Sequence, residues 1–225
     1  MRMRRKKNLE QKIAACGEYL IQPRCESLNF NETGENEQIS LIELFGNDAP
    51  VILEVGAGKG KFAAELAYQH PEYNILAVEK DSSVCVDAVE SIKEKGVKNA
   101  RVMKLRAEYL ARILPLQSIS RIYLNFSCPF PKNTYASHRL TAPRFLEIYR
   151  QILKPDGEIH QKTDNMRLFE FSIESFSQSG YSLKNVSLDL HNSAFEGNIM
   201  TEYETKFVSM GLPIYRLEAY LPEKR

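Results

Sequence analysis

Val51-Ile-Leu-Glu-Val-Gly-Ala-Gly-Lys-Gly-Lys-Phe62 is an apolar run that breaks into three alternate glycines and then enters a helical pattern. Glycine lets the backbone turn sharply and approach a ligand closely, and a helix that begins here directs unpaired N–H groups toward that ligand. The next apolar run ends in Glu79, about twenty residues beyond the turn, where a carboxylate can bind the ribose hydroxyls of an adenosine. The stretch therefore predicts a strand, turn and helix that bind a nucleotide cofactor.

The spacing of the glycines separates two classes of cofactor. A dinucleotide-binding turn follows G-x-G-x-x-G, whereas Gly56, Gly58 and Gly60 alternate and Lys61 stands where the third glycine would fall. This pattern favours S-adenosylmethionine over NAD. The alternative is an ordinary strand-to-helix turn without a ligand, and Glu54, the glycines and Glu79 together argue against it.

Strands and helices alternate after residue 50, which is typical of a parallel sheet with helices on both faces. We expect strands at 51–55, 75–78, 101–105, 121–126, 158–162, 182–190 and 206–221. The predicted fold class is α/β, a doubly wound, mostly parallel, seven-stranded Rossmann-like sheet whose last two strands form an antiparallel C-terminal hairpin. Residues 1–225 are expected to form a single domain, in which 1–20 are a basic N-terminal arm.

Composition narrows the class of protein further. The sequence contains no apolar run of about 18 residues, and its basic start is not followed by a signal-type hydrophobic stretch, so we expect a cytoplasmic protein without a membrane partner. The four cysteines, Cys16, Cys25, Cys85 and Cys128, form no Cys-x-x-Cys pair and accompany no histidine cluster at zinc spacing. We therefore expect reduced thiols and no metal.

Basic residues gather in two places. Five of the thirty Lys and Arg residues lie between Arg2 and Lys7, in an arm that either contacts phosphates or is simply solvated. From Tyr109 to Leu146 there is no Asp or Glu, although the overall acid content of 29 in 225 residues predicts about five there. An acid-free basic segment beside a cofactor pocket suits a polyanionic substrate, and a chance gap around buried strand residues is the alternative.

Several further motifs carry a resemblance to a known family. They are the opening Met1-Arg-Met-Arg4, Glu54-Val-Gly-Ala-Gly-Lys-Gly60, Leu124-Asn-Phe-Ser127 with Pro129-Phe-Pro-Lys132, Gly157-Glu-Ile-His-Gln-Lys-Thr-Asp-Asn165, and Phe195-Glu-Gly-Asn-Ile-Met-Thr-Glu-Tyr-Glu204. Over nearly its whole length the chain resembles the bacterial tRNA (guanine-N7-)-methyltransferases, class I enzymes that methylate a guanine in the variable loop. The resemblance implies S-adenosylmethionine as cofactor and tRNA as partner, for a chain that acts as a monomer or homodimer.

The resemblance also implies roles for individual residues. Together with the residue arguments above, it leads us to expect cofactor contacts at Glu54, Gly56, Gly58, Glu79, Lys80, Arg106, Ala107 and Cys128, of which Arg106 and Cys128 differ from the family. Substrate contacts are expected at Lys132, Asp164, Asn165, Thr201 and Glu204. Arg139 and Arg144 extend the track of positive charge that begins at Lys132. Phe130 either stacks on the guanine or packs in the protein.

Three positions depart from the pattern of this family. Cys128 stands where the family has aspartate, Phe130 where it has tryptophan, and Arg106 where it often has an acid that meets the adenine. Backbone N–H groups of Arg106 and Ala107 can contact the adenine instead, and Cys128 is expected to pack beside the methionine part of the cofactor. These changes bear on efficiency and substrate choice more than on the fold.

The expected chemistry needs no general base, because guanine N7 carries an in-plane lone pair and no proton. Rate can come from aligning N7 with the methyl carbon and from negative groups that favour the positive charge growing on the guanine. We expect Asp164 and Glu204 to accept hydrogen bonds from the N1–H and N2–H₂ edge, with Thr201 and Asn165 as neutral partners and Cys128 beside the reacting centre.

Three alternatives remain at this stage. The same scaffold can methylate another RNA or a small molecule, or the chain can be a non-catalytic or weakly active tRNA-binding relative, which Cys128 makes conceivable. The third is a nicotinamide oxidoreductase, which the glycine spacing opposes.

Overall fold

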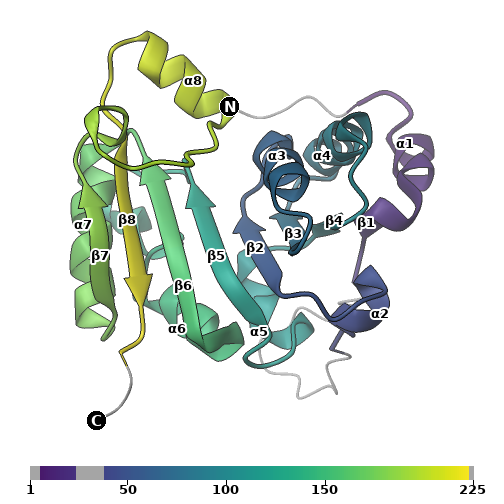
Figure 1. Ribbon diagram of the computed structural model, residues 1–225, viewed down its shortest axis with the longest axis horizontal. Coiled ribbons are helices and arrows are strands. Elements are labelled where there is room, and N and C mark those ends of the chain that lie inside the picture. Colours follow the sequence, from purple (N-terminus) through teal and green to yellow (C-terminus); the bar gives the residue numbers. More distant parts are fainter. Residues whose placement is uncertain (1–5, 24–37, 223–225) are drawn as a thin grey trace.

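The protein is built around one twisted sheet, shown in Figure 1, a ribbon view of the computed structural model, which describes residues 6–23 and 38–222. Eight strands lie in the order β1-β4-β3-β2-β5-β6-β8-β7. Their bounds are β1 Leu20–Ile21, β2 Val51–Val55, β3 Asn74–Glu79, β4 Ala100–Lys104, β5 Ile119–Asn125, β6 Leu153–Thr163, β7 Ser182–Ser187 and β8 Tyr215–Tyr220. The first six are parallel, and β8 is antiparallel to both β6 and β7, which confirms the predicted fold class.

Helices cover the two faces of the sheet unequally (Figure 1). The helices are α1 Leu9–Cys16, α2 Leu41–Phe45, α3 Lys61–Gln69, α4 Ser82–Lys95, α5 Leu110–Ile113, α6 Pro143–Ile152, α7 Met166–Gln178 and α8 Glu202–Ser209. One apolar cluster joins α5, α6 and α7 to the back of the sheet, and a second joins α3 and α4 to the front of β2, β3 and β4. Among the described residues, no helix covers the front of β5, β6 and β8 (Figure 1).

Two expectations near the N-terminus are refined. An eighth strand, β1, pairs through Leu20 and Ile21 with β4, although two residues are too few to show a strand pattern in the sequence. Part of the predicted arm is folded, because α1 packs on α4 and Lys6 bonds Asp87. Arg2, Arg4 and Arg5 lie outside the described residues, as does Cys25, so the arm's contact with phosphates stays a prediction.

The prediction of a strand from 206 to 221 is wrong in its first part. Residues 202–209 form α8, which begins with a capping box in which the side chains of Thr201 and Glu204 each accept a hydrogen bond from the other residue's backbone N–H. A turn follows, and the strand β8 starts only at Tyr215. The other predicted strand, 182–190, ends at Ser187, and the pairing of β7 with β8 confirms the antiparallel C-terminal arrangement.

Candidate active site

The glycine turn joins β2 to α3 and packs tightly against its neighbours. The N–H groups of Gly56 and Ala57 both donate to the carbonyl of Val78 on β3, at 2.8 and 3.0 Å. Gly60 has φ +73°, and a Cβ there would lie 2.8 Å from the backbone of Ala88 on α4, so only glycine lets the two helices approach this closely. A Cβ at Gly58 would meet nothing within 4 Å, because this residue faces open space.

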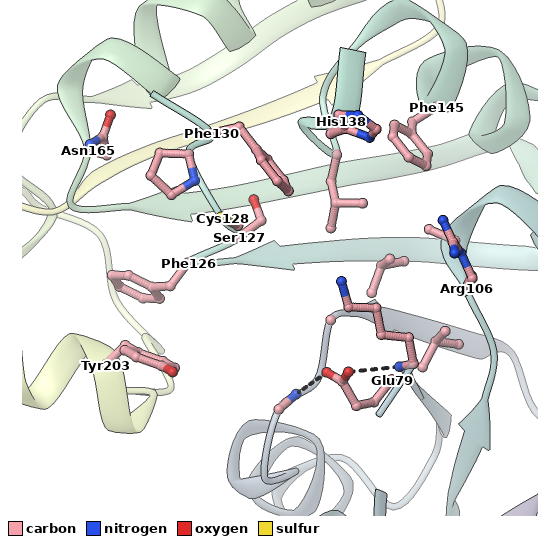
Figure 2. Close-up of a pocket in the computed structure, with 18 of the residues that line it drawn as sticks. Glu79, Arg106, Phe126, Ser127, Cys128, Phe130, His138, Phe145, Asn165 and Tyr203 are labelled. Carbon is pink, nitrogen blue, oxygen red and sulfur yellow. Dashed lines mark hydrogen bonds between the residues drawn. The ribbon is translucent and has the colours of Figure 1, made fainter. Parts of the chain in front are cut away.

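Glu79 ends β3 and turns its carboxylate back toward the glycines (Figure 2). Oε1 accepts hydrogen bonds from the N–H groups of Lys80 at 2.8 Å and Asp81 at 3.1 Å, and Oε2 accepts one from Gly58 at 3.3 Å. A carboxylate offers about four acceptor positions. One position on Oε2 therefore remains for a ligand, and the three backbone donors fix its direction.

A cavity of about 620 Å³ opens at the carboxyl ends of the parallel strands. This is the edge of the sheet at which doubly wound proteins bind their ligands, and the volume is in the usual range for cofactor sites. The structure brings most of the predicted site residues to its wall: Gly56, Gly58, Glu79, Lys80, Arg106, Ala107, Cys128, Asp164 and Asn165. Glu54, Lys132, Thr201 and Glu204 do not line it.

Glu54 lies beneath the turn, in the protein interior. Its side chain is on β2, its exposed fraction is 3%, and Oε1 accepts a hydrogen bond from Asn125 at 3.1 Å while Oε2 has no partner among the described residues. Burial raises the pKa of Glu54 to about 8, although Asn125 and Lys162 act in the opposite direction. The group is therefore largely protonated at neutral pH, and it supports the turn from below.

The positive charge of Arg106 is balanced by an acidic residue beside it, Glu108. Its guanidinium bonds Glu108 at 3.1 Å, and Arg144 lies 3.5 Å from the same carboxylate oxygen. Burial alone would raise the pKa of Glu108, but the hydrogen bond from Arg106 and the charge of Arg144 leave it lowered. Glu108 lines the cavity, and sequence reasoning missed it because that reasoning looked for an acid only at position 106.

The loop after β5 is held in a strained form over the cavity. Phe126 and Phe130 have φ values of +48° and +41°, which residues other than glycine rarely adopt. Arg139 secures the loop by donating to the carbonyls of Pro129 and Phe130 at 3.0 and 3.1 Å, and its guanidinium lies over Phe171. The expectation that Arg139 extends a phosphate-binding track is wrong, because this side chain is buried and already bonded.

Three residues of this loop matter for the site. The Cys128 side chain is exposed and lines the cavity, and Phe130 also lines it and lies 5.6 Å from the ring of His138. Lys132 follows just outside the cavity and is exposed, so it is placed to meet a ligand that extends beyond the pocket.

Asp164 and Asn165 divide two tasks at the start of α7. Asn165 is the N-cap residue, because its side chain accepts from the N–H of Leu168 at 2.9 Å. Asp164, for which capping was the alternative to a site role, is not the cap. Both residues line the cavity, on the side opposite Glu79 and Arg106, as the position of Asn165 in Figure 2 shows.

Glu204 is fully buried in a network that anchors α8. Lys162 donates to Oε2 of Glu204 at 2.6 Å and to the carbonyl of Ile199 at 2.8 Å, while Asn198 donates to Oε1 at 2.6 Å. His191 lies 3.0 Å from Oε1. This carboxylate has its partners inside the protein and does not reach the cavity, and Thr201 is occupied as the helix cap.

Two aromatic residues of α8 reach the cavity instead. Tyr203 and Phe207, one helical turn apart, both line it, and their rings lie 6.4 and 6.0 Å from that of Phe126. Figure 2 shows Tyr203 on α8 at the edge of the pocket. This residue is well exposed, at 59%. The sequence analysis missed both: it placed Phe207 in the strand predicted for 206–221 and gave Tyr203 no element, although their spacing of four is helical.

The sheet, with its cavity at the carboxyl ends of the parallel strands, has the fold of known methyltransferases. Two solved structures have the same fold: the 16S rRNA methyltransferase KamB, with TM-score 0.58 and 17% identity over 77% of this chain and 88% of that one, and precorrin-6y C5,15-methyltransferase from Geobacter metallireducens, with TM-score 0.53 and 16% identity over 77% and 80%. At such identities the likeness concerns the fold alone.

Sequence comparison gives the family. A family described as putative methyltransferase matches residues 48–217. The tRNA (guanine-N(7)-)-methyltransferase of Geobacillus sp. (strain WCH70) is 45% identical over 100% of this chain and 97% of its own. The tRNA (guanine-N(7)-)-methyltransferase of Bacillus subtilis (strain 168) is 47% identical over 78% of this chain and 82% of its own. The chain therefore belongs to the family of the tRNA (guanine-N(7)-)-methyltransferases.

Within residues 6–23 and 38–222, none of the helices has the length and apolar character that crossing a bilayer requires.

Proposed function

We propose that this protein transfers a methyl group from S-adenosylmethionine to N7 of a variable-loop guanine in tRNA. The observation that carries the proposal is the Glu79 carboxylate, held by three backbone N–H groups at the glycine turn beside a cavity of cofactor size. The names of the relatives support the nature of the reaction and of the substrate.

The residues present suit the cofactor. The free acceptor position of Glu79 would take a ribose hydroxyl, and the open space at Gly58 admits a ligand against the N-terminus of α3. The adenine would lie near Arg106 and Ala107, and the methionine part toward Cys128. When bound, the cofactor supplies an electrophilic methyl group on a sulfonium.

Guanine recognition belongs to the opposite wall of the cavity. Asp164 can accept hydrogen bonds from the N1–H and N2–H₂ edge, and its negative charge favours the positive charge that develops on the ring. Asn165 is its neutral neighbour, and Tyr203 and Phe126 offer aromatic faces for the base. No residue has to remove a proton, because N7 carries none.

We assign Glu204 and Thr201 a positioning role in this function. Both act through α8, since the buried network of Glu204 and the cap of Thr201 hold Tyr203 and Phe207 against the cavity. Cys128 would touch the cofactor, and Lys132, exposed beside the cavity, would meet a tRNA phosphate.

The test is methylation of an unmodified tRNA transcript with labelled cofactor, followed by mapping of 7-methylguanine. Loss of a hydrogen bond to a charged group costs about 1.5–3 kcal/mol, so Asp164→Asn is expected to lower kcat/KM by about 10- to 100-fold. Asp156→Asn removes an exposed acid far from the cavity and serves as the matched control. No 7-methylguanine from the wild-type protein, or an unchanged rate for Asp164→Asn, would contradict the proposal.

One observation favours a second function, that of a tRNA-binding protein with little or no methyl transfer. Cys128 lines the cavity at the position where the pattern of the resembled family has aspartate, and the sulfur of cysteine is a weak hydrogen-bond acceptor. This alternative predicts that the wild-type protein binds tRNA without product, and that Cys128→Asp gains methyl transfer.

A further inference from the structure

The front of β5, β6 and β8 is a polar face, in contrast to the apolar back of the same strands. Side chains alternate between the faces of a strand. Ile122, Leu124, Ile159, Leu217 and Ala219 enter the core at the back, while Arg121, Tyr123, Glu158, His160, Lys162, Arg216 and Glu218 share the front. The register places Arg121 beside Glu158 and Lys162 beside Arg216. This face is built for polar contacts.

Most charges on this polar face are paired within the protein. Lys162 pairs with Glu204, and Arg216 pairs with Glu218 and lies 3.7 Å from the centre of the Phe195 ring. Glu158 bonds both Lys184 and His160. The possible metal-ligand atoms of Glu158, His160 and Glu218 lie within 4.8 Å of one another. Lys184 already neutralises Glu158 and Arg216 neutralises Glu218, which argues against a metal there.

Arg121 is the exception. Its guanidinium forms no ion pair with the described residues, and its one hydrogen bond goes to the Tyr123 hydroxyl at 3.4 Å. The Nε atom is buried without an acceptor in the described part of the chain. Because a buried donor without a partner is costly, this group is suited to an external acceptor.

Arg121 lines a second cavity, which is distinct from the cofactor pocket. This cavity, of about 300 Å³, lies between α3, the front of β5, β6 and β8, and the segment 195–199, which leads to α8. Figure 1 shows that segment crossing the front of the sheet, the side on which α3 lies. The walls include Phe62, Tyr123 and Phe195, and the lining charges are Arg121, Lys162 and Arg216 against Glu218. One positive charge, that of Arg121, is left over.

We propose that this second cavity binds a phosphate group of the RNA substrate through the guanidinium of Arg121. Arginine presents several N–H donors in a planar fork that matches phosphate oxygens, and the aromatic walls can receive the attached ribose or base. Arg121 belongs to the acid-free segment 109–146, and the carboxylate beside it on β6, that of Glu158, already bonds Lys184 and His160. The inference rests on the proposed function, because it takes RNA as the ligand.

The experiment measures tRNA binding by filter retention at several salt concentrations, with no methyl transfer required. Arg121→Gln is expected to weaken tRNA binding by about tenfold and to reduce the slope of log K against log[salt] by about 1, as the loss of one phosphate contact should. Arg121→Lys should keep most of the slope. Lys98→Gln removes an exposed charge just before β4, which lies three places from β5 in the sheet, and should leave both quantities unchanged.

Two further measurements make the result decisive. Adenosylhomocysteine affinity should be the same for Arg121→Gln and the wild type, since the two cavities are separate. Unchanged tRNA affinity and salt slope in Arg121→Gln would overturn the proposal. So would adenosine monophosphate binding that depends on Arg121 while tRNA binding does not, which would indicate a free nucleotide. Absence of 7-methylguanine in the wild-type assay contradicts the proposed function instead, and leaves the binding test valid.

Discussion

A single buried carboxyl group links the cofactor turn to the protein's response to pH. Glu54 lies next to the last residue of β2, just before the glycines, with one oxygen bonded to Asn125 and the other without a partner in the described chain. Its ordinary pKa is 4.5, and burial raises it to about 8. The folded protein therefore binds a proton at this site at pH values where the unfolded chain has released it.

The sign of the effect follows from this difference in pKa. A raised folded-state pKa gives stability that is complete below pH 4.5 and is lost as pH rises toward about 8. One pKa unit corresponds to about 1.4 kcal/mol, so the loss should reach a few kcal/mol. Glu54→Gln resembles the protonated form, and we expect its unfolding free energy to fall less than that of the wild type between pH 5 and pH 9.

Urea unfolding at the two pH values measures this difference. Glu94→Gln changes an exposed acid of α4 and should keep the wild-type dependence. If the unfolding free energy of Glu54→Gln and of the wild type changed with pH by the same amount, Glu54 would be ionised in the folded protein.

The sequence predicts the positions of some single residues at the site well and those of others poorly. Gly56, Gly58 and Glu79 could be placed because a turn and a strand end fix their positions locally. Arg139 and Glu204 could not, because the partners that bury them, Pro129 and Phe130 for one and Lys162 for the other, depend on tertiary packing. A charged residue in a sequence carries no sign of whether its partner is solvent or protein.

Among the elements, α8 shows how a short helix is positioned over a site. It has eight residues, and a helix of that length is marginal by itself. The capping box starts it, and the bond between Lys162 on β6 and Glu204 fixes it to the sheet. Tyr203 and Phe207 reach the cavity because the helix is held at this place.

Breaking the buried pair should release α8. Lys162→Met leaves the Glu204 carboxylate buried without its cation, and we expect a loss of about 3–5 kcal/mol in unfolding free energy. The double variant Lys162→Met/Glu204→Leu removes both charges and should recover much of that loss. Urea unfolding gives the energies, and hydrogen exchange at residues 202–209 reports on the helix itself.

The comparison between the single and double variants is the control. If the double variant were no more stable than Lys162→Met, the pair would not be what anchors the helix. Loss of methyl transfer with adenosylhomocysteine affinity retained would match a positioning role for α8.

The sequence predicted most elements but not this one. The five longer parallel strands, β2 to β6, are predicted because buried strands are short apolar runs. The stretch 206–221 mixes apolar and polar residues without a clear period, and the helix start at Thr201 depends on a cap that the strand prediction ignored. The two-residue strand β1 is too short for any pattern.

Over the whole molecule, one sheet presents two different cavities. The first lies at the carboxyl ends of the strands and the second on the polar front of β5, β6 and β8. The alternation of strands and helices in the sequence predicts the parallel sheet, and the order of its strands comes from the structure. The second cavity depends on where the segment 195–199 crosses the sheet.

Ligand-dependent stability tests the class of cofactor for the intact protein. A ligand at about 100 times its Kd adds about 2.7 kcal/mol, which raises the Tm of a chain of this size by about 5–10 °C. We expect adenosylhomocysteine to produce such a rise in thermal unfolding and NAD to produce none. Glu79→Gln should reduce the rise, and stabilisation by NAD alone would support the oxidoreductase alternative.

The place of β8 within the sheet has a consequence for biosynthesis. This strand, made last of the eight, lies between β6 and β7 and pairs with both. Until β8 has left the ribosome, β7 has no neighbour to pair with among the described strands and the outer edge of β6 stays open. A nascent chain stalled in that interval would present two exposed strand edges, a state prone to aggregation and to capture by chaperones.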